Sequence, residues 1–148
     1  MSTLRFAAVN ADGLLADLDL PPAAYRALLK LRALSEPGGR IHIDQATIGH
    51  QLSLSRPSVN AALRTLELAR LVKKVRNGLY QINPMLAGYN SPEDAVAAVH
   101  TMPAEDRLDT RDFLPNYHQA VAAYENHLVE KRRRQQDLKR RQALKAVS

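Results

Sequence analysis

The chain has 148 residues, of which 45% are hydrophobic and 24% charged, the proportions of an ordinary soluble globular domain. It contains no cysteine, which excludes disulfides, thiolate metal sites and cysteine nucleophiles. No apolar run approaches the roughly 18 residues of a membrane span, and the N-terminus is a poor secretion signal. We therefore expect a cytoplasmic protein with no membrane partner.

The net charge of +6 is distributed unevenly along the chain. Residues 1–39 are neutral, whereas residues 40–76 carry seven basic and two acidic side chains. Residues 77–130 carry two basic and eight acidic side chains, and residues 131–148 carry eight basic and one acidic. Two basic blocks that flank an acidic one indicate a polyanionic partner. For the last block, a solvated helix face or a disordered tail is an equally open interpretation.

Residues 1–20 form an N-terminal segment, in which LRFAAV is compatible with a short strand and DGLLADLDL with a turn and a weak helix. A stronger helix signal begins at Pro21, because proline is tolerated in the first turn of a helix. Apolar residues then follow at spacings that predict one helical face: Tyr25, Leu28, Leu29, Leu31 and Leu34. The sequence EPGG at 36–39 ends this helix, and the alternating RIHID at 40–44 predicts a short strand.

Two short helices are expected next, in close succession. Asp44 is a capping residue for a helix over 45–52, and Ser55 for a helix from Arg56 to about Arg70. The residues expected to pack between them or to plug the turn are Ile48, Leu52, Leu54, Val59, Leu63 and Leu66, with Gly49 allowing close approach. The outer face of the second helix then presents Ser55, Arg56, Ser58, Asn60, Ala61 and Arg64, with no carboxylate before Glu67.

The stretch LVKKVRNGLYQINP, residues 71–84, predicts a β-hairpin, because two strand-favouring runs flank Asn77-Gly78, a strong type I′ turn signal. That turn would pair Arg76 with Leu79, Val75 with Tyr80, Lys74 with Gln81, and Lys73 with Ile82. One face would hold Leu71, Val75, Tyr80 and Ile82, with Lys73 at its edge. The opposite face would hold Lys74, Arg76 and Gln81, along with Val72 and Leu79. We therefore expect Lys74 and Arg76 to face outward, and Lys73 not to.

The remaining sequence predicts two helices. Ser91 and Pro92 begin the first, with acidic residues in its first turn, and the polar stretch TMPAEDRLDTRD that follows is turn-like. The second runs from Leu114 almost to the end. Its apolar residues are spaced as a short heptad seam: Leu114, Tyr117, Val121, Tyr124 and Leu128. We expect residues 87–130 to be a packing or dimerisation region in which both tyrosines pack, and residues 131–148 to be a basic helix or tail.

Two short helices joined by a tight turn are the architecture of a helix-turn-helix, whose second helix enters the major groove of DNA. The sequence IGHQLSLSRPSVNAALRTLELARLVKKVRNGLYQINP resembles the winged helix-turn-helix regulators of the Crp and MarR type. Its ending, NGLYQINP, is similar to the RepL-like plasmid replication and copy-control proteins. The resemblance covers about residues 21–86, and it departs from the family at Ser53, where a left-handed glycine is usual.

For residues 21–86 the resemblance implies a mainly α winged helix-turn-helix domain with a small β-hairpin wing. The patterns outside it add the N-terminal segment and the long C-terminal helix. The resemblance also implies which residues would contact DNA bases, namely Ser58, Asn60, Ala61 and Arg64. Ser55 and Arg56 would contact the DNA backbone, and the hairpin adds Lys74 and Arg76 to that role. Arg132, Arg133 and Arg134 are candidates for additional DNA contacts.

No enzyme signature accompanies these motifs. The five histidines lack metal-binding spacing, and the paired carboxylates at 93–94 and 105–106 fit helix starts better than acid–base chemistry. We expect no catalytic residue, metal or cofactor. The favoured interpretation is a homodimeric, site-specific binder of double-stranded DNA, a bacterial regulator of transcription or of plasmid replication and maintenance. The alternatives are a protein- or RNA-interaction module with the same fold and tail, and a MarR-type sensor with a ligand pocket at its dimer interface.

Overall fold

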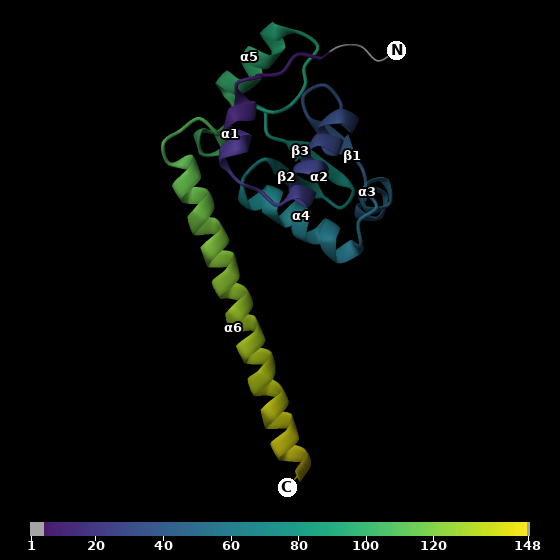
Figure 1. The fold of residues 1–148 in the computed structure, drawn as a ribbon, viewed down its shortest axis with the longest axis vertical. Helices are drawn as coiled ribbons and strands as arrows, with labels where there is room; N and C mark the ends of the chain where they lie inside the picture. Colours follow the sequence, from purple (N-terminus) through teal and green to yellow (C-terminus); the bar gives the residue numbers. More distant parts are fainter. Residues whose placement is uncertain (1–4, 148) are drawn as a thin grey trace.

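Residues 5–147 are the part of the chain that the computed structural model describes (Figure 1). Their elements, in chain order, are α1 (Ala11–Asp17), α2 (Pro22–Leu34), β1 (Arg40–His42), α3 (Gln45–Leu52), α4 (Arg56–Leu68), β2 (Val72–Arg76), β3 (Leu79–Ile82), α5 (Pro92–Thr101), the single 3₁₀ turn η1 (Ala104–Asp106) and α6 (Phe113–Val147). The fold is therefore mainly helical, with one small antiparallel sheet and a long C-terminal helix, as the sequence predicts.

Side-chain caps explain where three of the helices begin. The Asp44 carboxylate accepts the N–H of Thr47 at 2.7 Å, which satisfies a donor that has no partner within α3. The hydroxyl of Ser55 accepts an N–H in the first turn of α4, and that of Ser91 does the same for α5. The predicted starts of all three helices are confirmed.

The core is formed where α2 packs on α3 and α4. The buried face of α2 consists of Ala24, Ala27, Leu28 and Leu31. Two of the residues assigned to this face are instead solvent-exposed, Leu29 at 59% and Leu34 at 46%. For Leu29 the reason is geometric: successive helical residues point about 100° apart, so Leu29 points away from a face centred on Leu28 and Leu31. Leu34 is the last residue of α2.

The sheet has the strand order β1-β3-β2, and all its strands are antiparallel. The predicted pairing of Arg76 with Leu79 is confirmed, but Lys74 pairs with Tyr80 and Lys73 with Gln81. A bulge at Val75 shifts this register by one residue. Gly78 has φ +79 while Asn77 does not adopt a positive φ, so the predicted type I′ turn is wrong. Val75 is 44% exposed, whereas Val72 and Leu79 are buried, the reverse of the faces expected for these three residues.

The N-terminal segment lies against the connection that follows the hairpin. Phe6 and Tyr89 exchange two backbone hydrogen bonds of 2.9 and 2.8 Å, forming an isolated bridge. The strand considered for LRFAAV is thus reduced to one bridge, and its first residue lies outside the described part. The weak helix expected after it is α1.

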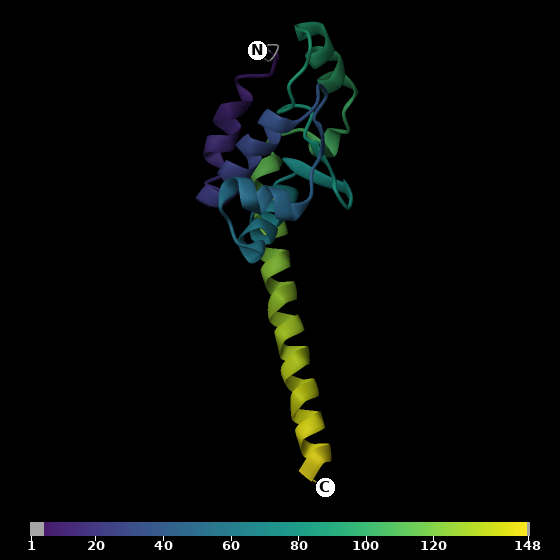
Figure 2. The same cartoon turned by 90° about the vertical axis from the view of Figure 1, so that its right-hand side faces the viewer.

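Helix α6 leaves the globular part of the molecule and projects away from it, as both ribbon views show (Figures 1 and 2). Phe113 and Tyr117 are buried at its start, whereas Leu114 is 37% exposed and does not belong to the buried seam. From residue 131 to residue 147 every side chain is exposed. Across residues 5–147, no helix combines the length and apolar character that crossing a bilayer would require.

Candidate nucleic-acid interface

The turn between α3 and α4 is held in one conformation by local backbone contacts. Ser53 adopts the left-handed conformation, with φ 53 and ψ 43, as expected for the position where glycine is usual. The N–H of Leu54 then donates to the carbonyl of Gly49 at 2.9 Å. A side chain at Gly49 would begin 2.9 Å from the carbonyl oxygen of Leu54, which explains the glycine. Arg26 of α2 also donates to the carbonyl of Leu52, so the end of α3 is tied to the core.

Burial of one face of α4 determines which side chains are left outside. Val59, Ala62, Leu63 and Leu66 are buried against α2 and α3. Of the residues predicted to contact DNA, Arg56, Ala61 and Arg64 are exposed, and Ser58 and Asn60 are half-buried. The hydroxyl of Ser55 donates to that of Ser58 at 2.9 Å while capping the helix. The Ser55 hydroxyl is therefore already engaged at the start of α4, which competes with the predicted contact to a phosphate.

A small hollow of about 140 Å³ brings together residues from α3, α4 and the hairpin. Its polar lining consists of Gln45, Asn60, Arg64, Glu67 and Lys74, above an apolar floor of Leu63 and Tyr80. Two of the predicted base-contacting residues and one predicted backbone-contacting residue thus meet at one place. Gln45, the first residue of α3, was not among the predicted contact residues, because its position in the sequence does not show that it faces α4 and the hairpin.

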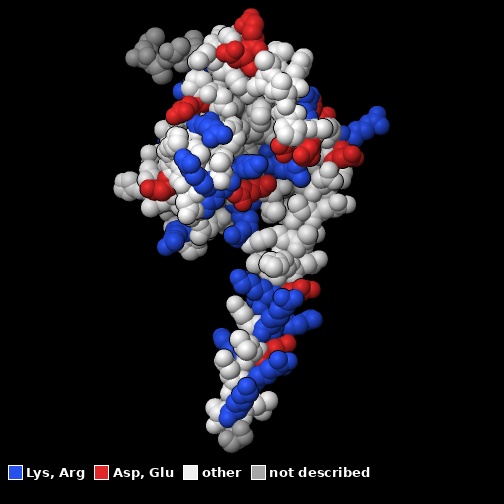
Figure 3. All heavy atoms as spheres, turned by 180° about the vertical axis from the view of Figure 1, so that it is seen from behind, with Lys and Arg blue, Asp and Glu red and all other residues white. Residues whose placement is uncertain are grey.

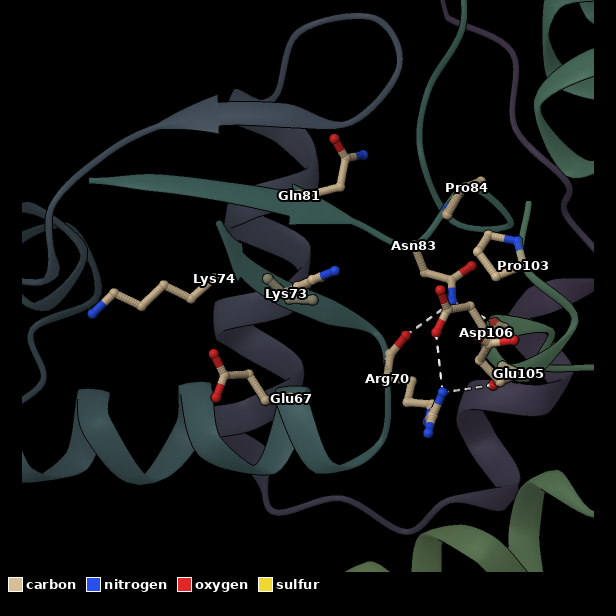
Figure 4. A pocket seen from close by; sticks show the side chains of 11 residues that line it. Glu67, Arg70, Lys73, Lys74, Gln81, Asn83, Pro84, Pro103, Glu105 and Asp106 are labelled. Carbon is tan, nitrogen blue, oxygen red and sulfur yellow. Dashed lines mark hydrogen bonds and ion pairs between the residues drawn. The ribbon is translucent and has the colours of Figure 1, made fainter. Parts of the chain in front are cut away.

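The hairpin presents its three basic residues in different directions. Lys74 pairs with Tyr80 and therefore lies on the side of the sheet that faces α4, whereas Lys73 pairs with Gln81 on the opposite side. Figure 4 shows the two lysines diverging, with Lys74 above α4. Lys73, Lys74 and Arg76 are all exposed, so the expectation that Lys73 faces inward is wrong. No described carboxylate forms an ion pair with any of the three.

A larger groove of about 560 Å³ lies beside the hairpin, between the end of α4 and the connection from α5 to α6 (Figure 4). Arg70, at the end of α4, donates to the carbonyl of Glu105 at 3.0 Å and to the carboxylate of Asp106 at 3.2 Å. The amide of Asn83 donates to the carbonyls of Arg70 and Asp106 and accepts the N–H of Met85. These contacts attach the connection to the sheet. Asn83, the asparagine near the end of NGLYQINP, therefore has a structural role in these contacts, not a ligand-binding one.

Helix α6 covers part of the outer face of α4. The guanidinium of Arg64 donates to the hydroxyl of Tyr124 and lies over its ring, with the guanidinium carbon 4.8 Å from the ring centroid. Tyr117 is buried one heptad earlier, which confirms that it packs. The N-terminal half of α4, from Arg56 to Asn60, remains uncovered by α6. Arg64 is therefore the predicted base-contacting residue whose position depends on another element.

The basic residues of α6 lie apart from these groups. Arg132, Arg133 and Arg134 are exposed in the projecting half of the helix, where Figure 3 shows basic side chains gathered along its length. A long contact of 4.0 Å joins Arg134 to Glu130 of the same helix. Within the described residues there is no group of three histidine or acidic side chains that could hold a metal ion.

Comparison with known proteins found no match: no family model, no curated protein and no solved structure matches this chain.

Proposed function

We propose that this protein binds double-stranded DNA at specific sites, with α4 as the recognition helix and the β2–β3 hairpin as the wing of a winged helix-turn-helix. The order of elements from α2 to β3, helix, strand, helix, turn, helix and hairpin, supports this assignment. The resemblance of the same residues to winged regulators supports a role in transcription or in plasmid replication and maintenance.

The observation that carries the proposal is the meeting of Asn60, Arg64 and Lys74 around one hollow. Amide and guanidinium groups match the hydrogen-bonding edges of adenine and guanine, and a lysine without an ionic partner suits a phosphate. Asn60 is half-buried, so its side chain can adopt fewer rotamers than it could on a fully exposed surface. A protein that recognises base edges needs side chains with restricted conformations, and a nearby cation that binds the DNA backbone. This hollow provides both.

The roles within this site can be refined from the geometry. Ser58, Asn60, Ala61 and Arg64 remain assigned to bases, and Arg56, Lys74 and Arg76 to the backbone. Ser55 acts by capping α4 rather than as a free ligand, because its hydroxyl already bonds Ser58. Lys73 points away from α4 and is not included.

The experiment has two stages. Selection from a random duplex pool identifies a preferred site, and fluorescence anisotropy then measures binding to that site and to a random duplex over a salt series. Asn60→Ala should lower the preference for the selected site without changing the dependence of affinity on salt. Lys74→Ala should instead weaken binding to both duplexes and lower the salt slope by about 0.9. Arg111→Ala, an exposed cation beside the start of α6, is the matched control. Sequence-blind binding, or tighter binding to RNA, would contradict the proposal.

Within this proposal the protein acts as a homodimer. Helix α5 buries none of its residues, and it borders a mainly apolar hollow of about 370 Å³ with Phe6 and Val96 on its wall. Both side chains are close to half exposed, as at a surface that a second copy would cover. Sedimentation equilibrium should show a dimer, and Val96→Glu should shift it to monomer. A parent protein that is monomeric at all concentrations would contradict this part of the proposal alone.

A further inference from the structure

The projecting half of α6 carries a concentrated positive charge. Residues 131–145, here called the basic arm, include eight basic side chains and one acidic side chain. All of them are exposed. Figure 3 shows this blue segment standing clear of the globular part, where basic and acidic side chains are interleaved. The arm therefore offers a cation surface that the fold of the globular part does not use.

The basic side chains surround the arm instead of lying on one face. Arg132, Arg133 and Arg134 point about 100° apart, and Lys139, Arg140 and Arg141 repeat those directions two turns later. A helix lying on a membrane needs one apolar and one basic face. Leu138 and Leu144, the apolar residues within the arm, lie about 120° apart and form no such face. Charge on all sides fits a concave polyanion, such as a DNA groove with phosphates along both edges.

The contact between Arg64 and Tyr124 fixes where the arm begins relative to α4. Tyr124 touches the outer face of α4, and Lys131 follows seven residues later, about 10 Å further along the helix. From Tyr124 to Lys145 the helix extends about 32 Å. This is close to one turn of B-DNA, about 34 Å. The arm itself, from Lys131 to Lys145, accounts for about 21 Å of this length, so beside a duplex held against α4 it could cover about two thirds of a turn.

We propose that the basic arm lies in a groove of the same duplex that α4 reads and contacts phosphates on both of its edges. This inference rests on the proposed function and adds a second contact surface and a longer footprint to it. The arm contributes affinity and salt dependence without base preference, because its side chains are long, exposed cations spread around the whole helix.

The test uses the full chain and random-sequence duplexes of two lengths, about 30 and about 12 base pairs, or roughly three turns and one. The arm variant carries Arg132→Gln, Arg133→Gln and Arg134→Gln, and the matched control carries Arg→Lys at the same positions. On the long duplex the glutamine variant should lose about 2 to 3 units of salt slope, while the lysine control keeps the parent slope. On the short duplex the three proteins should differ little, because one turn is filled by α4 and the hairpin.

Each other outcome overturns a specific claim. An unchanged slope for the glutamine variant on the long duplex, with Asn60→Ala still reducing site preference, would mean that α4 binds DNA and the arm does not. If the glutamine variant lost binding to an RNA hairpin but not to DNA, the arm would be an RNA-binding element instead. Failure of the parent protein to bind any duplex would overturn the proposed function and the arm with it. Circular dichroism checks that the glutamine variant keeps the helix content of the lysine control.

Discussion

Arg64 of α4 and Tyr124 of α6 are joined twice, by a hydrogen bond to the tyrosine hydroxyl and by stacking of the guanidinium over the ring at 4.8 Å. A guanidinium has five N–H donors, so the bond to Tyr124 leaves enough of them for a bidentate contact with guanine. Tyr124 therefore restricts the conformations of Arg64 without using up its hydrogen-bonding capacity. The long helix is in this way connected to the side chains proposed to read bases.

This relationship predicts that Tyr124 affects site preference. Tyr124→Phe removes the hydroxyl and keeps the stacking, whereas Tyr124→Ala removes both, and a cation–π contact at an exposed site contributes about 0.5 to 1 kcal/mol. We expect preference for the selected site over a random duplex to fall about twofold in the first variant and about fivefold in the second. The salt slope should not change, because no phosphate contact is lost. Anisotropy titrations on both duplexes measure these effects, and tighter binding by Tyr124→Ala would show instead that α6 masks Arg64.

Glu67 is the carboxylate that shares the hollow with Asn60 and Lys74. Its charge opposes phosphate binding there, so Glu67→Gln should raise the affinity for a random duplex about two- to fivefold at low salt. Glu93→Gln on α5 removes the same charge from an exposed position outside the hollow and is the control. Fluorescence anisotropy at two salt concentrations compares the affinities of both variants with that of the parent protein. A fall in affinity for the selected site would show that Glu67 accepts a hydrogen bond from a base.

Asn83 is expected to matter for stability and not for binding. The residue is 5% exposed, and its side chain donates to the carbonyls of Arg70, after α4, and of Asp106 in η1, and accepts the N–H of Met85. Asn83→Ala leaves buried backbone groups without partners, and we expect it to lower the free energy of unfolding by about 2 to 4 kcal/mol. Urea denaturation measures this, with the exposed Asn126→Ala as control, expected within about 0.5 kcal/mol of the parent. A loss of DNA affinity at unchanged stability would contradict this structural role.

Local rules explain why much of the fold could be predicted from the sequence. A cap such as Asp44 or Ser55 acts on backbone groups three residues away, and the left-handed Ser53 follows from the tight turn that it occupies. The helices, the order of elements and the residues on the outer face of α4 follow from such short-range signals.

Features that depend on distant residues could not be predicted in the same way. One such feature is the sheet: the pairing of β2 with β3 is shifted by the bulge at Val75, and β3 also pairs on its other edge with β1, where Ile41 lies opposite Tyr80. The hairpin alone contains no information about that partner. Likewise Arg64 and Tyr124 are 60 residues apart, and heptad spacing shows that Tyr124 lies on the packed side of α6 but not what it touches.

The cap of α3 predicts a pH dependence of stability. The N–H of Thr47 donates to the Asp44 carboxylate and lowers the pKa of that carboxyl below its usual value of 3.8. A pKa that is lower in the folded state gives stability that is present above 3.8 and is lost as the pH falls through the folded value. Asp44→Asn keeps a cap oxygen but removes the charge, so it isolates this effect.

We expect Asp44→Asn to melt at a lower temperature than the parent near neutral pH, and the difference to shrink as the pH falls below 3.8. Asp44→Ala should melt lower still at neutral pH and should keep a deficit in acid, because it loses the cap oxygen as well as the charge. Thermal unfolding followed by circular dichroism over a pH series measures both variants. A difference between parent and Asp44→Asn that stays constant into acid would show that the hydrogen bond, and not the charge, stabilises the start of α3.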